Sequence, residues 1–595
     1  MVLSTVLCTV FPTSAENANT IDGSCGKNLT WVYDYSTKTL TISGEGDMPN
    51  YSYSKAGGLA PWVNSTSISN GLETVVISDG VTSIGEYAFY YCDSLKNAVI
   101  PNSVKTINEG AFYHCDALTD VVIPSSVTSV EEDAFSYCNG ITSITIPGSV
   151  TSIGDGAFSY CDSLTSAVIQ DGVKNIGMQA FYRCGSLSDI TLHDNVESIG
   201  ENAFKLSGYY QDESNWENGV LYIDRHLIKA GDGDLDQSVS GAYCVIPGTR
   251  NIADGAFFYC DSLTSIELPD SVVCIGNHAF DNCNGLSRID IPKSVTTIGS
   301  EAFYVCFDLA SINVDPDNTA YCSEGGVLYN KEKTEIIRFP KEKAGISFAI
   351  PNGVTKIADG AFESCENLTD VSIPNGVEIL GSDAFSDCSG LTGITIPESV
   401  TSIGSSAFSE CSNLTDIAIP DGVWCLAEKT FFKCKKLKSI TIPNSVTVIG
   451  SQAFDNCSRL TDVYYVGNPN DGNDILTSYP LVHKTIHYLS GISAKRTDDS
   501  VAVELLNIDV GKTVILALYD GDKLVEVQRS SEYGENGKLV FMPFQIRQSI
   551  SMLQILIHFF RLSQFQHCRR QIYAIKNIIG IFEFFSNQSR AAPQI

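Results

Sequence analysis

The chain has 595 residues, which at about 150 residues per domain would correspond to roughly four domains unless the sequence repeats internally. Hydrophobic residues make up 43% and charged residues 18%, a composition typical of folded proteins and not of disordered ones. Lys and Arg number 38 against 69 Asp and Glu, so the formal net charge is -31. This charge repels phosphate, and it argues against nucleic acid as a partner and against simple attraction to an anionic membrane.

The N-terminal segment resembles the end of a secretory signal peptide. An apolar run from Val2 to Phe11 is followed by the small residues of 13–15. No Lys or Arg precedes Lys27, so the basic start of such a signal is missing. We predict that residues 1–20 are the remnant of a signal peptide and that the protein is secreted or at the cell surface. An unstructured N-terminal stub is the alternative.

A motif of the form Ala-Phe-x-x-Cys repeats along the chain. Its phenylalanine recurs at every twenty-third position, interrupted only by one step of 53 and one of 59, at Phe89, Phe112, Phe135, Phe158, Phe181, Phe204, Phe257, Phe280, Phe303, Phe362, Phe385, Phe408, Phe431 and Phe454. Fourteen units therefore share one phase, with two insertions between whole units. A fixed period of this length predicts a repeat architecture.

Each unit contains two short patterns typical of strands. Val121 and Ile123 alternate with outward residues before a proline, and Val127 and Val130 follow in a second short apolar stretch. A single unit is too short to enclose a core, so the units must stack to bury their apolar side chains. With parallel strands about 4.8 Å apart, fourteen coils would form a rod of about 65 Å.

The repeat resembles the BspA-like class of leucine-rich repeat, found in surface proteins of bacteria and some protists. The resemblance rests on Leu-x-x-Ile-x-Ile, Val-Thr-x-Ile-Gly and Ala-Phe-x-x-Cys, and it covers residues 73–465. Residues 21–72, with Ser24-Cys25-Gly26 and Pro61-Trp62, resemble the N-terminal cap of bacterial members. The resemblance implies a leucine-rich-repeat solenoid of short parallel strands stacked coil on coil. It also implies a non-catalytic role in adhesion to, or binding of, a host or matrix protein.

The remaining regions differ in pattern. The insertions, near 207–250 and 315–349, resemble each other and each predicts two short strands around a polar turn, which would either project and shape a binding surface or be inert. Residues 466–490 are predicted to cap the last coil, and 491–545, with three strand-like runs, predict a partial β-sandwich. Residues 546–595 carry six basic residues against one acidic residue. This atypical basic and apolar tail suggests either a shifted reading frame or an amphipathic membrane-surface helix.

The chain has 20 cysteines, and most of them occupy one repeat position. Thirteen follow the repeat phenylalanine by three positions: Cys92, Cys115, Cys138, Cys161, Cys184, Cys260, Cys283, Cys306, Cys365, Cys388, Cys411, Cys434 and Cys457. We interpret them as a column of small buried thiols, because in-register neighbours rarely reach the torsion of a disulfide; a disulfide column is the alternative. Their spacing does not resemble a zinc site.

The sequence contains no recognisable catalytic, metal-binding or phosphate-binding motif. We therefore expect no enzyme activity, no cofactor and no metal. No apolar run reaches the roughly 18 residues that a membrane-spanning helix requires. The expected partner is a protein such as a host or matrix protein, and the chain itself is expected to be a monomer.

Two columns of residues are candidate binding surfaces. The outward position of the first strand is small, polar and acidic, and includes Asp120, Asp189, Asp370 and Asp416, which would suit a basic or polar protein partner or would be a merely solvated face. The position before the repeat cysteine carries Tyr91, Tyr137, Tyr160 and Tyr259, with His114 and Arg183 between them. These tyrosines either form a contact surface or pack beneath the neighbouring coil.

The sequence thus predicts a leucine-rich-repeat solenoid with a small C-terminal β-sandwich-like region, acting by protein binding or adhesion at a cell surface. The alternative is the accessory region of a larger secreted carbohydrate-active or cell-wall enzyme whose catalytic domain is missing.

Overall fold

The computed structural model describes residues 19–52, 58–231, 239–343, 345–466, 484–488, 492–496, 500–505, 513–520, 523–530, 539–540, 544–545 and 553–560. The chain divides into two compact units, the first comprising residues 1–309 and 313–320 and the second comprising 310–312 and 321–595. Each unit is described separately. The predicted signal-peptide remnant falls almost wholly outside the described residues, as do most of the 466–490 cap and most of the tail.

The first unit begins with an antiparallel meander that leads into parallel ladders. Its first sheet consists of β1 (Thr20–Ser24), β2 (Leu29–Asp34), β3 (Thr39–Gly44), β5 (Thr74–Ile77), β7 (Asn97–Val99) and β9 (Asp120–Val121). Pairing is antiparallel up to β3 and parallel from β3 onward. Two short helices, α1 (Pro61–Asn64) and α2 (Thr66–Ser69), precede β5. Trp62 is fully buried and its ring stacks on Phe89, so this segment covers the first aromatic of the repeat.

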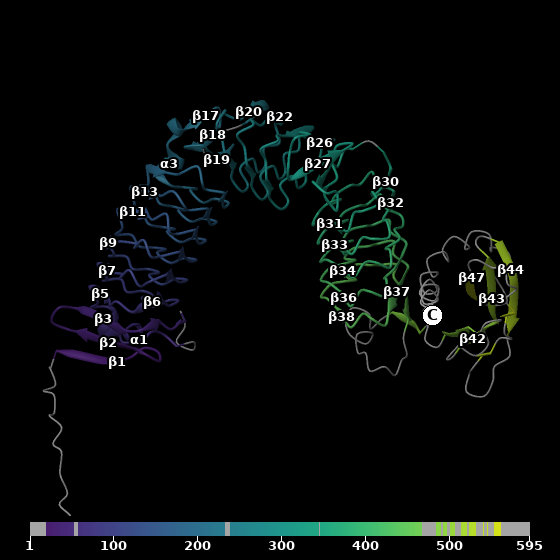
Figure 1. Ribbon diagram of the computed structural model, residues 1–595, viewed down its shortest axis with the longest axis horizontal. Coiled ribbons are helices and arrows are strands. Elements are labelled where there is room, and N and C mark those ends of the chain that lie inside the picture. The colour runs from purple at the N-terminus through teal and green to yellow at the C-terminus, as the bar shows by residue number, and fades with distance from the viewer. Residues whose placement is uncertain are drawn as a thin grey trace, which may run out of the picture. The chain divides into compact units, whose positions relative to one another are not determined.

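Two strands of each coil then continue in separate parallel ladders (Figure 1). The first-strand ladder continues in β11 (Ser143–Ile146), β13 (Ser166–Ile169) and β15 (Asp189–Thr191). The second-strand ladder comprises β4 (Gly46–Asp47), β6 (Val81–Ile84), β8 (Thr106–Ile107), β10 (Ser129–Val130), β12 (Ser152–Ile153), β14 (Asn175–Ile176) and β16 (Ser198–Ile199). From β6 onward the register advances by one repeat period at each step, as in Val130 to Ile153.

The remaining strands of the first unit surround the first insertion. After α3 (Gly208–Gln211) and the 3-10 helix Glu213–Asn215, one sheet contains β17 (Trp216–Glu217), β18 (Val220–Ile223), β19 (His226–Ala230), β21 (Asn251–Ile252), β23 (Cys274–Ile275) and β25 (Thr297–Ile298). The other contains β20 (Gly241–Cys244), β22 (Leu263–Glu267), β24 (Arg288–Ile291) and β26 (Ser311–Val314).

The second unit repeats this plan. One sheet runs through β27 (Tyr321–Glu324), β28 (Val327–Asn330), β29 (Glu335–Arg338), β31 (Lys356–Ile357), β33 (Ile379–Leu380) and β34 (Ser402–Ile403). Shorter ladders consist of β30 (Ser347–Ala349) with β32 (Asp370–Ser372), and of β36 (Cys425–Leu426) with β38 (Val448–Ile449). The last parallel sheet is β35 (Asp416–Ala418), β37 (Ser439–Pro443), β39 (Asp462–Val466) and β40 (Thr485–Tyr488).

Two antiparallel sheets follow. The first holds β41 (Ile492–Arg496), β42 (Ser500–Leu505), β45 (Leu539–Val540) and β46 (Phe544–Gln545), and the second holds β44 (Lys523–Ser530), β43 (Thr513–Asp520) and β47 (Leu553–Phe560). Within the tail, residues 553–560 are therefore a strand paired with β43, and not part of an amphipathic helix. The β-sandwich predicted for this region stays a prediction.

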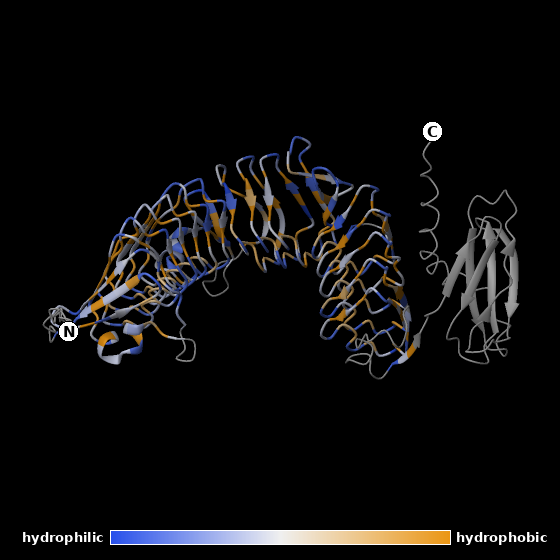
Figure 2. Ribbon diagram, turned by 60° about the horizontal axis from the view of Figure 1, so that its bottom comes forward, coloured by the Kyte–Doolittle hydropathy of each residue, from blue (hydrophilic) through white to orange (hydrophobic). Residues whose placement is uncertain are grey.

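The core is a column of identical side chains within each unit. The phenylalanines stack face to face between coils, for example Phe135 on Phe158 with ring centroids 5.3 Å apart and planes 6° apart. Val, Ile and Leu from both strands of the coil join them in the interior, and the alternation along the strands is visible in Figure 2. The chain is thus a β-solenoid of stacked parallel strands, as the sequence predicts.

The glycine of the Ile-Gly pair allows successive coils to approach closely. A Cβ at Gly404 would lie 2.3 Å from the backbone nitrogen of Ser382, and a Cβ at Gly154 would lie 2.4 Å from the carbonyl carbon of Glu131. Any side chain there would push the coils apart, which explains why glycine recurs in the repeat.

The insertions are built into the solenoid and do not project as free hairpins. Strand β19 pairs antiparallel with β18 but parallel with β21, and β29 pairs antiparallel with β28 but parallel with β31. Phe339, at the end of the second insertion, stacks on Phe362 with centroids 5.1 Å apart. Each insertion buries its apolar strand residues by supplying an extra, irregular coil, which is why the two-strand pattern recurs in both.

Candidate binding surface

Every repeat unit turns two corners in the left-handed backbone conformation. These corners lie two positions before and two positions after the repeat phenylalanine. At the second corner, directly before the cysteine, φ lies between 45° and 62° in all fourteen units, and no glycine stands there. Side chains disfavour this conformation, so other contacts must hold it. At most corners the backbone N–H supplies one, as where Tyr91 donates to the carbonyl of Tyr113 in the next coil at 2.9 Å.

Four consecutive second corners carry aromatic rings that stack on one another. The ring centroids are 4.4 Å apart for Tyr91 and His114, 4.2 Å for His114 and Tyr137, and 4.4 Å for Tyr137 and Tyr160. Their planes diverge by 18°, 9° and 6°. In the next coil the guanidinium carbon of Arg183 lies 5.7 Å from the centroid of Tyr160. We call Tyr91, His114, Tyr137 and Tyr160 the aromatic ladder.

The aromatic ladder both packs between coils and reaches solvent. Tyr91 at its first end is 45% exposed, whereas His114, Tyr137 and Tyr160 are half-buried. Neighbouring rings cover each other's faces, and the open surface therefore consists mainly of ring edges and polar tips. The observed geometry is therefore compatible with both alternatives for these tyrosines, a contact surface and packing against the next coil.

Tyr259 is separate from the aromatic ladder. It is 62% exposed and its ring meets Phe258 at 4.3 Å, while the corners before and after it in the repeat carry Leu206 and Asn282. The structure therefore brings together three of the four predicted tyrosines. In the second unit the same corner carries Ser364, Asp387, Glu410 and Lys433, and there Lys433 forms an ion pair with Glu410 at 2.8 Å.

A row of mainly acidic residues directly follows the repeat cysteines in the coils of the aromatic ladder. Asp93, Asp116 and Asp162 each lie two positions after a residue of the ladder, and Asn139 occupies that place in the coil between. Asn139 donates to Asp116 at 3.1 Å, and His114 Nδ1 lies 3.7 Å from Asp116. Burial, reinforced by the charge of Asp116, raises the pKa of Asp93. This row holds negative charges close to one another.

A second acidic group lies near the first corner of the same coils. Burial raises the pKa of Asp133 to about 6, with a further contribution from the charge of Glu132. Glu109 and Asp155 add to the same repulsion. The charge of Asp133 also contributes to the raised pKa values of Tyr113 and Tyr137, after burial and neighbouring tyrosines.

The predicted acidic column on the first strands is exposed but dispersed. Asp120, Asp189, Asp370 and Asp416 are all exposed, each at the start of its strand. Asp189 accepts from Ser166 at 3.1 Å and Asp416 from Thr415 at 2.9 Å. Two of these aspartates belong to the first unit and two to the second, and small polar residues stand between them. The column therefore does not concentrate charge as the rows beside the aromatic ladder do.

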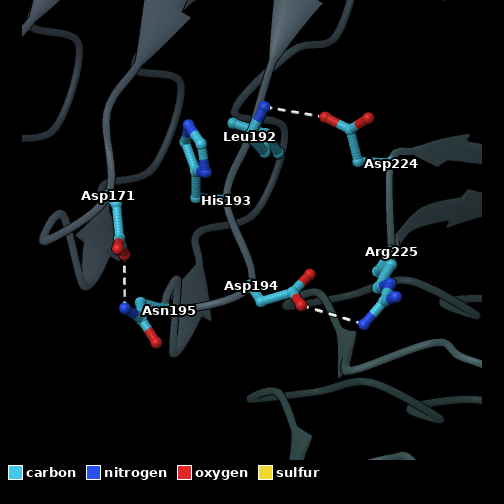
Figure 3. Close-up of a pocket in the computed structure, with 7 residues that line it drawn as sticks. All are labelled: Asp171, Leu192, His193, Asp194, Asn195, Asp224 and Arg225. Carbon is cyan, nitrogen blue, oxygen red and sulfur yellow. Dashed lines mark hydrogen bonds and ion pairs between the residues drawn. The ribbon is translucent and has the colours of Figure 1, made fainter.

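A polar cleft of about 530 Å³ opens where the first insertion meets the regular coils (Figure 3). Its lining residues come from the ends of β13 and β15 and from the turn between β18 and β19: Asp171, Leu192, His193, Asp194, Asn195, Asp224 and Arg225. Arg225 pairs with Asp194 at 2.9 Å, and Asp224 accepts the backbone N–H of Leu192 at 2.8 Å. These bonds join the insertion to the coils. Asp194, Asp224 and Arg225 therefore have a structural role in the cleft.

Within the described residues, no group of three or more His, Cys, Asp or Glu side chains is arranged to hold a metal ion. In the same part of the chain, no helix has the length and hydrophobicity that crossing a bilayer requires. The acidic rows beside the aromatic ladder were missed by the sequence analysis, although Glu109, Glu132 and Asp155 recur with the repeat period and could have revealed one of them.

Comparison with solved structures finds similar bacterial proteins. A leucine-rich cell surface protein from Faecalibacterium prausnitzii is 27% identical over 78% of this chain and 99% of its own, with a TM-score of 0.37. A leucine-rich repeat protein from Eubacterium ventriosum is 24% identical over 75% of this chain and 84% of its own, with a TM-score of 0.32. The pneumococcal vaccine antigen PcpA is 18% identical over 74% and 87%, with a TM-score of 0.36.

No curated protein sequence matches the chain significantly. The profile of the BspA type leucine-rich repeat region, in contrast, matches in six copies, over residues 82–211, 250–348 and 338–461. Those ranges contain more than half of the chain and all fourteen repeat phenylalanines. The chain belongs to the family of BspA-type leucine-rich repeat proteins.

Proposed function

We propose that the protein is a non-catalytic, secreted or cell-surface binding protein that attaches to a protein partner, such as a host or matrix protein, through the aromatic ladder. One observation carries the proposal: four stacked rings follow one edge of consecutive coils, with Tyr91 45% exposed at the end. Tyrosine is enriched at protein interfaces because it combines apolar area with a polar tip.

A protein partner fits this surface better than a sugar does. Sugars bind aromatic residues by stacking on ring faces, but in the aromatic ladder the inner faces are occupied by neighbouring rings 4.2 to 4.4 Å away. The exposed edges and hydroxyl groups instead suit apolar and hydrogen-bonding side chains of another protein. The large net charge of -31 argues against nucleic acid, because it repels phosphate.

The experiment compares capture of purified host and matrix proteins by the full chain and by two variants. Tyr137→Ser with Tyr160→Ser removes the last two rings of the aromatic ladder, and Tyr35→Ser removes a tyrosine that is 44% exposed elsewhere in the first unit. We expect the ladder variant to lose a partner that the wild type and Tyr35→Ser both retain. Retention of every partner by the ladder variant, with a lowered melting temperature, would show that the rings serve packing alone.

Localisation and assembly are part of the proposal. The apolar segment from Val2 to Phe11 supports export, and the family contains cell-surface proteins such as the one from Faecalibacterium prausnitzii. Protease treatment of intact cells that express the chain should release the repeat region before any cytoplasmic marker. Light scattering after size-exclusion chromatography should give the mass of one chain, and a dimer mass would contradict the monomer.

A further inference from the structure

We propose that the aromatic ladder and its flanking carboxylates bind a short, extended segment of the partner that is rich in lysine and arginine. This inference rests on the proposed function and specifies the chemistry of the partner. It assigns one role to two features that the repeat does not require: stacked rings at four consecutive corners, and acidic residues that lie two positions after and five positions before them in the sequence.

The carboxylates beside the aromatic ladder are not neutralised by the protein itself. In the part of the chain that the structure describes, Asp93, Asp162, Glu132 and Asp155 form no ion pair with a lysine or arginine, and the one ion-pair contact of Asp116 is with the imidazole of His114. Some carboxylates elsewhere on the solenoid are paired, as for Glu197 with Lys174 at 2.7 Å and Glu73 with both Lys38 and Lys96. The aromatic ladder is therefore a place where cations from another molecule are favoured.

The protein provides an internal example of the contact. The guanidinium carbon of Arg183 lies 5.7 Å from the ring centroid of Tyr160 and 5.8 Å from that of Tyr182. A cation over a tyrosine ring is attracted by the negative face of the ring. Arg183 thus places a guanidinium group at one end of the aromatic ladder. We expect a partner to present the same kind of group along the side of the ladder.

Basic side chains match both parts of the surface. Lysine and arginine have long methylene stems that cover apolar surface while the charged head stays at the polar boundary. Stems lying across the ring edges would direct the charged heads to Asp93 and Asp116 or to Glu132 and Asp155. Three coil steps of about 4.8 Å, from Tyr91 to Tyr160, span about 14 Å, which corresponds to about four residues of extended chain.

The second unit lacks these properties at the equivalent corners. There Glu410 and Lys433 neutralise each other at 2.8 Å, and Ser364 is buried. The site is consequently confined to the first five repeat units.

The test uses the full chain and labelled heptapeptides in which three residues, each arginine, citrulline or glutamate, alternate with glycine. Citrulline keeps the shape of arginine without its charge. We expect the arginine peptide to bind, with an affinity that falls as salt rises, and the citrulline and glutamate peptides to bind at least tenfold more weakly.

Three variants locate the site. The triple change Asp93→Asn, Asp116→Asn and Asp162→Asn, and separately Tyr137→Ser, should each weaken binding of the arginine peptide at least tenfold. Neutralising three exposed carboxylates of the second unit, in Glu332→Gln, Asp421→Asn and Glu428→Gln, should change it less than twofold. Circular dichroism and melting curves verify that each variant is folded.

Equal weakening by the ladder and control triplets would overturn the inference, since it would reveal only general attraction to an acidic protein. Failure of the wild type to bind the arginine peptide would overturn it as well. Failure of this inference can be distinguished from failure of the proposed function. A partner that is lost with Tyr137→Ser and Tyr160→Ser, but retained by the aspartate triplet, would leave the binding role intact and disprove the basic segment.

Discussion

The thiol of Cys115 donates a hydrogen bond to the backbone carbonyl of Phe89 in the preceding coil, at 3.2 Å. The same carbonyl accepts the backbone N–H of Cys92 within its own coil at 3.1 Å. The thiol contact recurs between most consecutive coils, for example from Cys138 to Phe112 and from Cys411 to Phe385, both at 3.1 Å. A buried cysteine therefore fills a small apolar space and also provides a weak donor to a carbonyl that has a second lone pair.

All but one of the thiols of this cysteine column should be inert in the native protein. In the described part of the chain no disulfide joins them, and burial raises the pKa values of Cys365 and Cys411 to about 12. A thiolate is the reactive form, so a thiol reagent at pH 8 should modify the cysteines of the column only after a denaturant is added, except Cys457, whose pKa is lowered by its hydrogen bond with Cys434. Detection of far fewer thiols under denaturing, non-reducing conditions would indicate the disulfide column instead.

Removing a core ring should cost far more stability than removing a ring of the aromatic ladder. Phe158 is fully buried, and it stacks between Phe135 at 5.3 Å and Phe181 at 5.4 Å. Phe158→Ala is expected to lower the free energy of unfolding by about 3–5 kcal/mol. Tyr160→Ser in the same coil should lower it by about 1 kcal/mol, because part of its ring remains in water. Urea denaturation of both variants provides the comparison, and similar losses would contradict the assignment of Tyr160 to a binding surface.

Neutralising Asp133 should stabilise the first unit at neutral pH. The pKa of this carboxyl is about 6 in the folded protein, above the ordinary value of 3.8, so ionisation opposes folding above pH 6 and the penalty disappears below about pH 4. Asp133→Asn keeps a residue that tolerates the left-handed corner, at φ 52°. We expect a gain of about 1 kcal/mol at pH 7.5, discounted for partial solvation, that fades as the pH falls from 6 to 4.

Melting temperatures of wild type and Asp133→Asn at several pH values test this. The exposed Asp79, changed to Asn, is the matched control and should have little effect at any pH. A gain for Asp133→Asn that is constant with pH would exclude ionisation as its cause.

Val305 should be the least favourable of the second corners. It is a β-branched residue at φ 45°, a conformation in which the branched side chain crowds the backbone. Val305→Asn is expected to raise the free energy of unfolding by about 1 kcal/mol, because asparagine adopts the left-handed region readily. Val305→Thr retains the branch and should not stabilise. An equal effect of the two changes in chemical denaturation would show that polarity, and not backbone strain, determines the stability there.

The regular coils could be predicted from the sequence because one period controls both pattern and packing. Phe135 and Phe158 are one repeat period apart and lie in contact, so the spacing alone places them in one column. The irregular coils could not be predicted in the same way. Phe339 stands one period before Phe362 and stacks on it, but Arg338 replaces the alanine of the motif and donates to the carbonyl of Gly360. The first insertion uses Lys229 similarly, at 2.8 Å from the carbonyl oxygen of Gly255.

The candidate site was predicted only in part, for a physical reason. Spacing predicts which side chains share a column, and it placed Tyr91, Tyr137 and Tyr160 together. Whether a ring is covered depends on the backbone conformation at the corner, and tyrosine does not signal a positive φ as glycine or asparagine would. The separation of Tyr259 from the others follows from the insertion, whose path the period does not specify. The domain boundaries stay predictions.

The side chain at the left-handed corner before the cysteine can change while the backbone of the corner stays the same. The same backbone geometry carries Tyr91, Arg183 and Lys433, with φ of 55°, 57° and 57°. Lys433 donates its N–H to the carbonyl of Asp455 at 2.8 Å, much as Tyr91 does to Tyr113. The main chain thus fixes where each side chain is displayed without fixing which side chain it is. Randomising these fourteen positions alone would therefore vary the recognised molecule along one edge while the frame that presents it stays the same.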